Sequence, residues 1–349
     1  MTRQTWSAVT AAVVFVLTAA LIAFVPIPFV AWVPGDSHDL LGSGADGRQV
    51  IQVDGLATYP TPGQLRLTTV SQTRADSSLS LPEALIDYLL PHRDILPRET
   101  VYEAGKPPTQ VEQEEKKLMT SAQSDAVVAA LREAGQPVAE FPRVTAVRTA
   151  GPSNGKLEPG DVVLTVDNEP VSMPAEVADR VRRKAVGEKV VIGFRRDGRA
   201  DTVTIDLAPS VNDGRVPTVG VSLDVGYSYN AEVSYAIDPA IGGSSGGLVF
   251  AVAIYDRITP SPLIDGRSVA GTGTINARGE VGVIGGVQQK IAGAEAAGAD
   301  IFLVPAGNCA DVAGIATSVR LVKVATLSEA VAALRDLKDP AREPAVPQC

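Results

Sequence analysis

The chain has 349 residues, a formal net charge of −9, two histidines and two cysteines. This acidic balance, without a marked basic cluster, argues against nucleic acid as a partner and against strong binding to anionic lipid headgroups. Two histidines with no paired Cys/His spacing give little support to a zinc centre. The Gly-x-x-x-x-Gly-Lys-Ser/Thr loop that wraps nucleotide phosphates does not occur in the sequence, so we expect neither a metal nor a nucleotide cofactor.

The first element in chain order is an apolar segment. Residues 8–33 carry no charge and exceed the roughly 20 residues that a helix needs to cross a bilayer. Arg3 precedes the segment whereas Asp36 and Asp39 follow it, which predicts a cytoplasmic N-terminus and an extracytoplasmic location for the bulk of the chain. Because no Ala-x-Ala cleavage site ends the run, we expect a single-pass anchor of the cell membrane over residues 1–34 rather than a removed signal peptide.

Three elements are expected between this anchor and the next module. Residues 64–70 alternate in the manner of a strand, and residues 110–134 have the pattern of a long helix. Ser80, with Glu83 three positions later, forms the capping-box pattern that begins a further helix. The segment is therefore expected to be folded rather than a linker.

Short β-rich runs around one helix fill residues 137–210. The stretches 150–152 (AGP) and 155–163 (GKLEPGDVV) resemble the Gly-Ser-Pro-Ala and Leu-x-x-Gly-Asp-x-Ile signature of PDZ domains. This resemblance implies a module that accepts an extended peptide as an added strand. Val177 and Val181, four apart on the helix, are predicted to line the peptide-binding groove, although a place in the core fits their spacing equally well.

A glycine-rich turn at residues 241–247 (IGGSSGG) precedes the apolar run 248–254 (LVFAVAI). The glycines permit a tight turn, after which Ser245 is expected to start a helix. Unpaired N–H groups at a helix N-terminus favour negative charge. We therefore expect the backbone N–H groups of Ser245, Gly246 and Gly243 to stabilise an oxyanion.

Lys290 lies in the first turns of an Ala-rich helix, where its side chain borders a packed face. A serine hydroxyl needs a base, and an amine serves as one only when burial keeps it neutral. His38 lies next to the membrane segment and His92 in a Pro-rich loop, so neither is expected to be that base. The pairing of Ser245 with Lys290 thus predicts a serine/lysine hydrolase, and a solvated surface lysine is the alternative.

At these residues the sequence resembles the proteolytic domain of the Lon family. The resemblance is carried by the segment IDPAIGGSSGGLVFAVAIYD and by the later segments GTGTI, IGGVQQK and GADIFLVP. It implies that the family's nucleophile, in an Asp-Gly-Pro-Ser-Ala-Gly motif, falls on Ser245. The general base, which closes a Gly-Gly-Leu-Lys-Glu-Lys motif, falls on Lys290, and the threonine that hydrogen-bonds this lysine falls on Thr272.

The sequence also departs from the family pattern. Ser244 replaces the family's proline, and three carboxylates are missing, with Gly242, Thr274 and Gln289 in their places. These changes predict a less acidic site with the dyad in place. They also keep open an inactive, membrane-tethered PDZ adaptor or scaffold. A signal-peptidase-like enzyme shares the serine/lysine chemistry but not the Ala-rich helix.

Taken together, the resemblance covers nearly the whole chain and matches membrane-anchored, PDZ-containing Lon-like serine proteases of the YlbL type. It implies an α+β fold in which a Lon-type proteolytic domain of mixed sheets and helices carries an inserted PDZ-like module. The expected order is anchor 1–34, first protease part 35–136, PDZ-like module 137–210, catalytic part 211–338 and C-terminal tail 339–349. Lon-type domains commonly form rings, so a homo-oligomer, a hexamer, is expected from the resemblance.

The predicted function is therefore that of an ATP-independent, membrane-anchored serine endopeptidase. Its expected partners are extended protein or peptide substrates of the cell envelope, which the PDZ-like module recruits or screens. Cys309 and Cys349 are the two cysteines, and an oxidising exterior permits them to form a disulfide that ties the Pro-rich tail to the loop after the run IFLVP. Two free thiols are the alternative.

Overall fold

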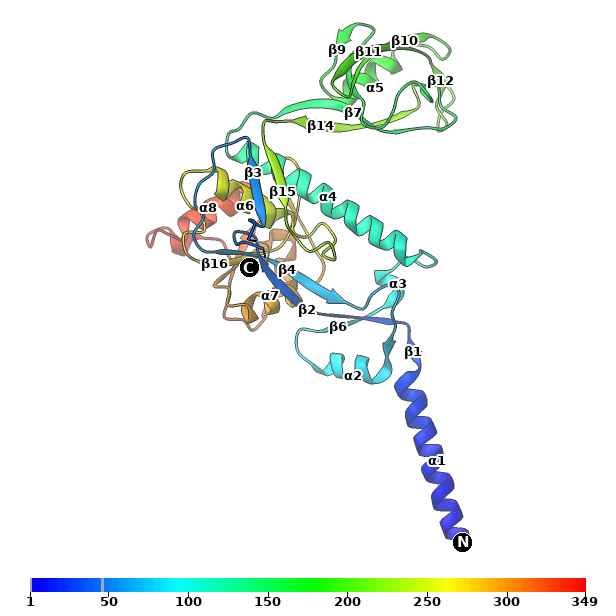
Figure 1. The fold of residues 1–349 in the computed structure, drawn as a ribbon, viewed down its shortest axis with the longest axis vertical. Coiled ribbons are helices and arrows are strands. Elements are labelled where there is room, and N and C mark those ends of the chain that lie inside the picture. Colours follow the sequence, from blue (N-terminus) through cyan, green and yellow to red (C-terminus); the bar gives the residue numbers. More distant parts are fainter. Residues whose placement is uncertain (1, 45–46) are drawn as a thin grey trace. The chain divides into compact units, whose positions relative to one another are not determined.

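The computed structural model describes residues 2–44 and 47–349 and divides the chain into two compact units. Unit 1 comprises Met1–Gln136 and Ala231–Cys349, and unit 2 comprises Pro137–Asn230. The chain therefore leaves unit 1, forms unit 2 and returns to unit 1 (Figure 1). Each unit has its own sheet and its own hydrophobic core.

The N-terminal residues form α1 (Arg3–Phe24), a helix of 22 residues that is long and apolar enough to cross a membrane. Its length is about 33 Å, close to the roughly 30 Å of a bilayer's hydrocarbon core. The predicted apolar segment extends to residue 33, but the helix ends before Pro26. Proline and the residue before it disfavour helix continuation, so the last part of the predicted span forms strands instead.

Unit 1 is built on a six-stranded sheet with the order β20-β19-β16-β4-β2-β6. Its strands are β2 (Phe29–Asp39), β4 (Gln64–Gln72), β6 (Asp94–Pro97), β16 (Ser268–Gly271), β19 (Ile301–Pro305) and β20 (Arg320–Val324). The four strands from β20 to β4 run parallel, and β2 and β6 complete the sheet with antiparallel pairing. Because parallel strands are covered on both faces, β19 is apolar and buried throughout.

Helices cover both faces of this sheet. Besides α1, the α-helices of unit 1 are α2 (Leu81–Leu89), α3 (Arg98–Val101), α4 (Pro108–Glu133), α6 (Gly247–Ile258), α7 (Val287–Ala296) and α8 (Leu327–Asp336). Ile291 of α7 packs with Phe302 on one face of β19. Val249 of α6 lies near Leu303 on the other face. All residues of α6 are buried, because α4 and α8 cover the side that the sheet does not.

Three short strand pairs complete unit 1. They are β1 (Pro26–Ile27) with β5 (Leu79–Ser80), β3 (Ile51–Asp54) with β15 (Glu232–Tyr235), and β17 (Thr274–Ile275) with β18 (Val281–Gly282). The predicted strand at 64–70 and helix at 110–134 are confirmed by β4 and α4. The predicted cap is confirmed as well, since Ser80 and Glu83 form a reciprocal capping box at the start of α2.

Unit 2 contains an antiparallel sheet with the order β11-β10-β8-β7-β14. Its elements are β7 (Ala139–Val147), β8 (Val162–Val166), β9 (Glu169–Pro170), α5 (Pro174–Arg182), β10 (Lys189–Arg196), β11 (Arg199–Asp206), β12 (Ala208–Pro209), β13 (Pro217–Thr218) and β14 (Val221–Ser228). The structure moves the predicted boundary from residue 210 to Asn230, because β14 pairs along β7 and so belongs to this sheet.

The apolar face of α5 packs into the core of unit 2. Val177 and Val181 are 2% and 4% exposed and belong to the same buried cluster as Val163 and Ile205. This burial contradicts the prediction that the two valines line an open peptide groove. A spacing of four residues marks any apolar stripe on a helix, and here the stripe faces the core.

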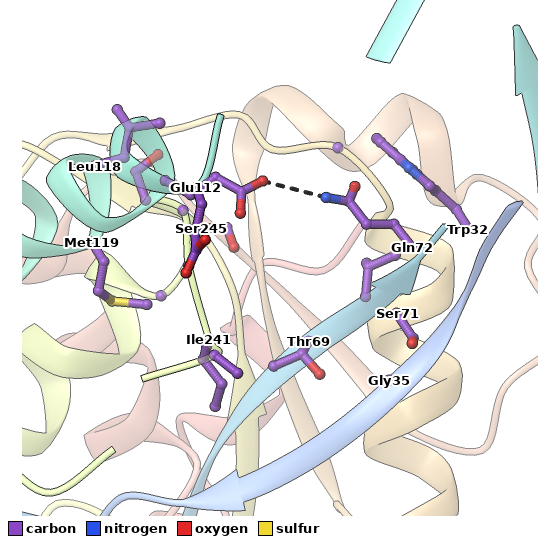
Figure 2. Close-up of a pocket in the computed structure, with 18 of the residues that line it drawn as sticks. Trp32, Gly35, Thr69, Ser71, Gln72, Glu112, Leu118, Met119, Ile241 and Ser245 are labelled. Atoms are coloured by element: carbon purple, nitrogen blue, oxygen red, sulfur yellow. Dashed lines mark hydrogen bonds between the residues drawn. The ribbon is translucent and has the colours of Figure 1, made fainter. Parts of the chain in front are cut away.

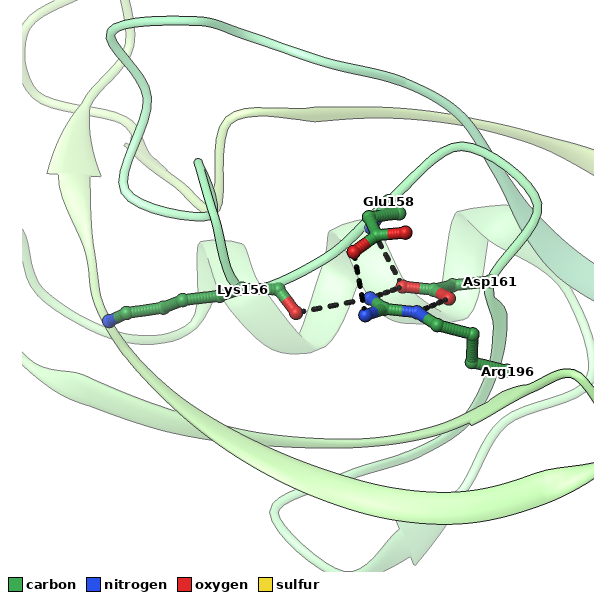
Figure 3. Close-up of polar contacts among 4 residues, drawn as sticks. All are labelled: Lys156, Glu158, Asp161 and Arg196. Carbon is green, nitrogen blue, oxygen red and sulfur yellow. Dashed lines mark hydrogen bonds and ion pairs between the residues drawn. The ribbon is translucent and has the colours of Figure 1, made fainter.

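An ion pair between Asp161 and Arg196 stabilises the 155–163 stretch (Figure 3). Asp161, 1% exposed, accepts hydrogen bonds from Nε and Nη2 of Arg196, both at 2.7 Å, and from the backbone N–H of Glu158 at 2.8 Å. Burial alone would raise the pKa of Asp161, but the hydrogen bonds from Arg196 and Glu158 outweigh burial and lower that pKa. The pair therefore stabilises the loop before β8.

Arg196→Met leaves the buried carboxylate of Asp161 without its cation, so we expect unit 2 to lose about 3 kcal/mol of stability at pH 7. Because the pKa of Asp161 is lowered in the folded state, its contribution is present above the unfolded pKa near 4 and is lost as the pH falls through the folded pKa. Urea unfolding of the wild type, Arg196→Met and the exposed-site control Arg199→Met measures the difference. Equal midpoints for all three proteins would show that the pair contributes nothing.

The C-terminal tail contains the 3₁₀ helix η2 (Glu343–Ala345), and its last residues lie along β20. A second 3₁₀ helix, η1 (Ala306–Val312), directly follows β19. The backbone N–H of Lys323 donates to the carbonyl of Pro347 at 3.0 Å. A disulfide joins Cys309 of η1 to Cys349. The tail is thus tied to the segment that follows β19, and the cross-link limits the freedom of the unfolded chain.

Candidate active site

Ser245 ends the loop that leads into α6. The helix begins at Gly247 with Gly246 as its N-cap, two residues later than the sequence predicts. The backbone carbonyl of Ser245 accepts the N–H of Gly273 at 2.8 Å. The side chain of Ser245 is therefore presented from a backbone that is fixed both by the buried helix and by the segment after β16.

Lys290 of α7 reaches the hydroxyl of Ser245. Its Nζ atom donates a hydrogen bond to Ser245 Oγ at 3.1 Å and a second one to the backbone carbonyl of Thr68 at 2.6 Å. Thr68 lies on β4, and its own hydroxyl donates to the carbonyl of Gly271 on the neighbouring β16. The centre of the sheet thus orients the amine toward the serine.

Burial sets the charge of this amine. Lys290 is 4% exposed, and desolvation lowers its pKa from 10.5 to about 8. Across residues 2–44 and 47–349, none of the ion pairs involves Lys290, so no carboxylate counteracts the effect of burial. At this pKa about a tenth of the amine is neutral at pH 7 and about half at pH 8, and the neutral form is able to accept a proton.

Thr272 has a different partner from the one the resemblance implies. Its hydroxyl donates to the backbone carbonyl of Ser245 at 3.0 Å, and Lys290 is bound by Thr68 instead. Thr68 on β4 thus provides the acceptor for the amine, whereas Thr272 follows the neighbouring strand β16 and bonds to Ser245. Thr272 therefore positions the backbone of the serine rather than the amine of the lysine.

The predicted oxyanion donors divide into two groups. Within the described part of the chain, no acceptor binds the backbone N–H of Ser245 or Gly246, and both groups stand at the N-terminal end of α6, where the helix dipole favours negative charge. The N–H of Gly243, in contrast, donates to the backbone carbonyl of Glu115 at 3.1 Å. Gly243 is therefore excluded as an oxyanion donor, because this part of the loop packs against α4.

A cavity of about 1100 Å³ opens above the serine and lies wholly within unit 1. Its walls are β2 and β4, α4, and the loop before Ser245, and Lys290 lies at its base. Figure 2 shows Leu118 and Met119 of α4 on one side of Ser245, with Trp32 and Gln72 on the other. The cavity is thus a groove with a mixed polar and apolar lining, and the hydroxyl group of Ser245 lies between its two sides.

Glu115 places a carboxylate beside the loop that precedes Ser245. A Cβ atom at Gly242 would lie 2.8 Å from Cβ and 3.2 Å from Oε2 of Glu115, so glycine at this position allows α4 to approach the loop. Gln72 of β4 donates to Oε1 of Glu115 at 3.4 Å, the bond drawn in Figure 2. Burial raises the pKa of Glu115. The prediction of a less acidic site is therefore corrected in part, since α4 supplies a carboxylate next to position 242.

Two further side chains from the sequence analysis lie at or near the groove. Gln289 is buried and donates from Nε2 to a carboxylate oxygen of Asp94 at 2.7 Å, which ties α7 to β6. His38 lines the groove from β2, and no hydrogen bond between described residues joins it to Ser245. Among the residues that the structure describes, no group of three or more His, Cys, Asp or Glu side chains is arranged to hold a metal ion.

Two protein-family models match the chain. The model of the PDZ domain matches residues 113–207, and the model of the Lon protease (S16) C-terminal proteolytic domain matches residues 237–335. The chain combines a PDZ domain with a Lon-type proteolytic domain. The fold class expected from the sequence is thereby confirmed. The Lon match contains both Ser245 and Lys290, and the PDZ match begins within α4 and ends before β14.

Curated relatives are similar to the Lon-type part. Lon protease 1 of Sorangium cellulosum is 40% identical over 95 residues, which cover 26% of this chain and 11% of that protein. The Lon protease of Neorickettsia sennetsu is 37% identical over 93 residues, with the same two shares. The chain thus spans about a tenth of the length of the curated relatives it matches.

A solved structure is similar to the PDZ part. The PDZ domain of the SdrC-like protein of Listeria monocytogenes is 24% identical, and the match covers 24% of this chain and 86% of that domain with a TM-score of 0.22. The PDZ assignment therefore stands on the family model.

Thr272→Val removes the side-chain hydrogen bond to the carbonyl of Ser245, and we expect the rate at which a fluorophosphonate labels Ser245 to fall about tenfold. Thr272→Ser keeps the hydroxyl and should retain most of the rate. Because the hydroxyl of Thr272 donates to Ser245 and the amine of Lys290 bonds to Thr68 and Ser245, the pH at half-maximal labelling should be the same in all three proteins. A shift of that pH in Thr272→Val would instead support the role of binding the lysine.

Proposed function

We propose that this chain is a serine endopeptidase whose nucleophile is Ser245 and whose general base is Lys290. The observation that carries the proposal is the 3.1 Å contact between Nζ of a buried lysine and the hydroxyl of a serine, inside a groove of a Lon-type proteolytic domain. Burying an amine without a carboxylate partner costs free energy, whatever the amine does for the protein. Its use as a base accounts for that cost, whereas an inactive scaffold does not.

The reaction follows from the contacts of the two side chains. Neutral Lys290 takes the proton of the Ser245 hydroxyl while the carbonyl of Thr68 holds Nζ in place. Oγ attacks the scissile carbonyl, and the N–H groups of Ser245 and Gly246 stabilise the resulting oxyanion. Protonated Lys290 then gives its proton to the leaving amine. A water molecule, deprotonated by the amine of Lys290, then attacks the acyl-enzyme and releases the acyl group, and the proton returns to Ser245.

The setting of the reaction forms the second part of the proposal. We infer that α1 is a single-pass anchor and that both units lie on the extracytoplasmic side, where the disulfide between Cys309 and Cys349 is stable. The PDZ domain recruits or screens extended segments of envelope proteins. Cleavage requires no ATP on this proposal. A homo-oligomeric ring remains a prediction from the resemblance to Lon proteases.

Removal of either member of the dyad tests the assignment. We expect Ser245→Ala to abolish peptide cleavage and Lys290→Met to reduce it at least about 10³-fold, because general-base catalysis contributes about that much. The exposed-site control Lys323→Met should keep the wild-type rate. Circular dichroism verifies that each variant is folded, and a fluorogenic peptide measures turnover. Wild-type turnover in folded Ser245→Ala or Lys290→Met would refute the dyad and favour a scaffold.

The pH dependence of the reaction tests the charge state of the base. Lys290 acts only when it is neutral, and burial lowers its pKa to about 8. Below this pKa the amine is protonated, so kcat/KM should rise as the pH increases from 7 to 9 and then level off. A profile that is flat through this range, or that still rises toward the ordinary lysine pKa of 10.5, would contradict a buried amine as the base.

A further inference from the structure

Large apolar side chains are exposed in one short stretch of unit 1. Six of them, each between 40% and 74% exposed, belong to α2 or to the residue after it: Leu81, Leu85, Ile86, Tyr88, Leu89 and Leu90. Beyond α1, no other stretch of ten described residues exposes more than two such side chains. Soluble surfaces rarely gather this much apolar area in one place unless another molecule or a membrane covers it.

The sequence of α2 explains why these side chains point outward. Only Ala84 is buried, in a small cluster with Ala31 and Leu79. At about 100° per residue, the remaining apolar residues cover an arc of roughly 160° on the helix. Glu83 and Asp87 lie outside this arc, where Glu83 caps the helix and Asp87 pairs with Arg93. The helix is therefore amphipathic, with its apolar face turned away from unit 1.

Backbone pairing locates the start of α2 beside the end of α1. The pair β1–β5 joins Pro26 to Ser80 and Ile27 to Leu79. One residue separates the end of α1 at Phe24 from β1, and α2 begins directly after β5. Because paired strands lie about 4.8 Å apart, the first turn of α2 is held close to the end of the helix that is able to cross a membrane.

We propose that α2 lies in the surface of the bilayer that α1 crosses and seats the proteolytic domain on the membrane. The inference rests on the membrane span proposed above. Its partner is the lipid headgroup and upper acyl region, the usual place of amphipathic helices with an aromatic side chain such as Tyr88 at their edge. The acidic side chains of α2 do not oppose this contact, because one is used in the cap and the other in an ion pair.

Seating α2 in the membrane surface would also place the groove close to that surface. β2 begins five positions after the end of α1 and runs into the groove, where Trp32 forms part of the wall. Trp32 is eight positions after Phe24 in the sequence, so this wall lies at most about 28 Å from the end of the anchor. The groove then receives extended segments close to the membrane surface, in the class of envelope proteins that are themselves anchored in the bilayer.

Site-specific quenching in the full-length protein tests the proposal. Single cysteines at Leu85, at Ala12 of α1 and at the exposed Val211 of unit 2 are labelled with the environment-sensitive fluorophore NBD, while the two native cysteines stay paired. The protein is reconstituted in phosphatidylcholine vesicles with or without a nitroxide-bearing lipid, and iodide serves as the aqueous quencher. We expect strong lipid quenching at positions 12 and 85 and iodide quenching at position 211.

Each other outcome overturns a different statement. Lipid quenching at position 12 with iodide quenching at position 85 would leave the anchor in place and refute the seating of α2. Shielding of position 85 from both quenchers would mean that protein covers the face, as a second copy of the chain would, and would also refute it. Absence of lipid quenching at position 12 would reject the membrane span itself, while the dyad remains open to its own test.

Discussion

The proposed chemistry depends on one contact, in which the amine of Lys290 lies between the hydroxyl of Ser245 and the backbone carbonyl of Thr68. Lys290 can occupy this place only because α7 covers one face of the sheet while β4 offers the carbonyl of Thr68. Desolvation then lowers the pKa of the amine toward neutrality without any help from a carboxylate. A more open fold would leave the amine of Lys290 solvated, with the higher pKa of an exposed lysine.

Other elements of unit 1 position Ser245 and enclose the groove around it. The buried helix α6 presents Ser245 at its N-terminal end, and the N–H of Gly273 and the hydroxyl of Thr272 fix the serine's carbonyl. Helix α4 closes the groove above the dyad and brings Glu115 against Gly242. These elements come from both sides of the inserted unit 2, so the groove is complete only after the chain has returned to unit 1.

Local patterns in the sequence predicted those side chains of the candidate site that their own neighbours in the sequence mark. The glycine-rich turn marked Ser245, and an isolated lysine in an Ala-rich helix marked Lys290. Thr68 could not be found in this way, because it acts through a backbone carbonyl, which every residue has, from 222 positions away. Val177 was misplaced because a groove and a core produce the same helical spacing.

Direct titration of Lys290 tests the central claim most closely. Lysines labelled with ¹³C at the ε-carbon can be followed by NMR between pH 6 and pH 11, and the signal of residue 290 is identified as the one missing from Lys290→Met. Burial in the groove predicts a midpoint at about pH 8. A midpoint near 10.5, the value of a solvated lysine, would contradict the claim that the fold supplies Ser245 with a neutral base.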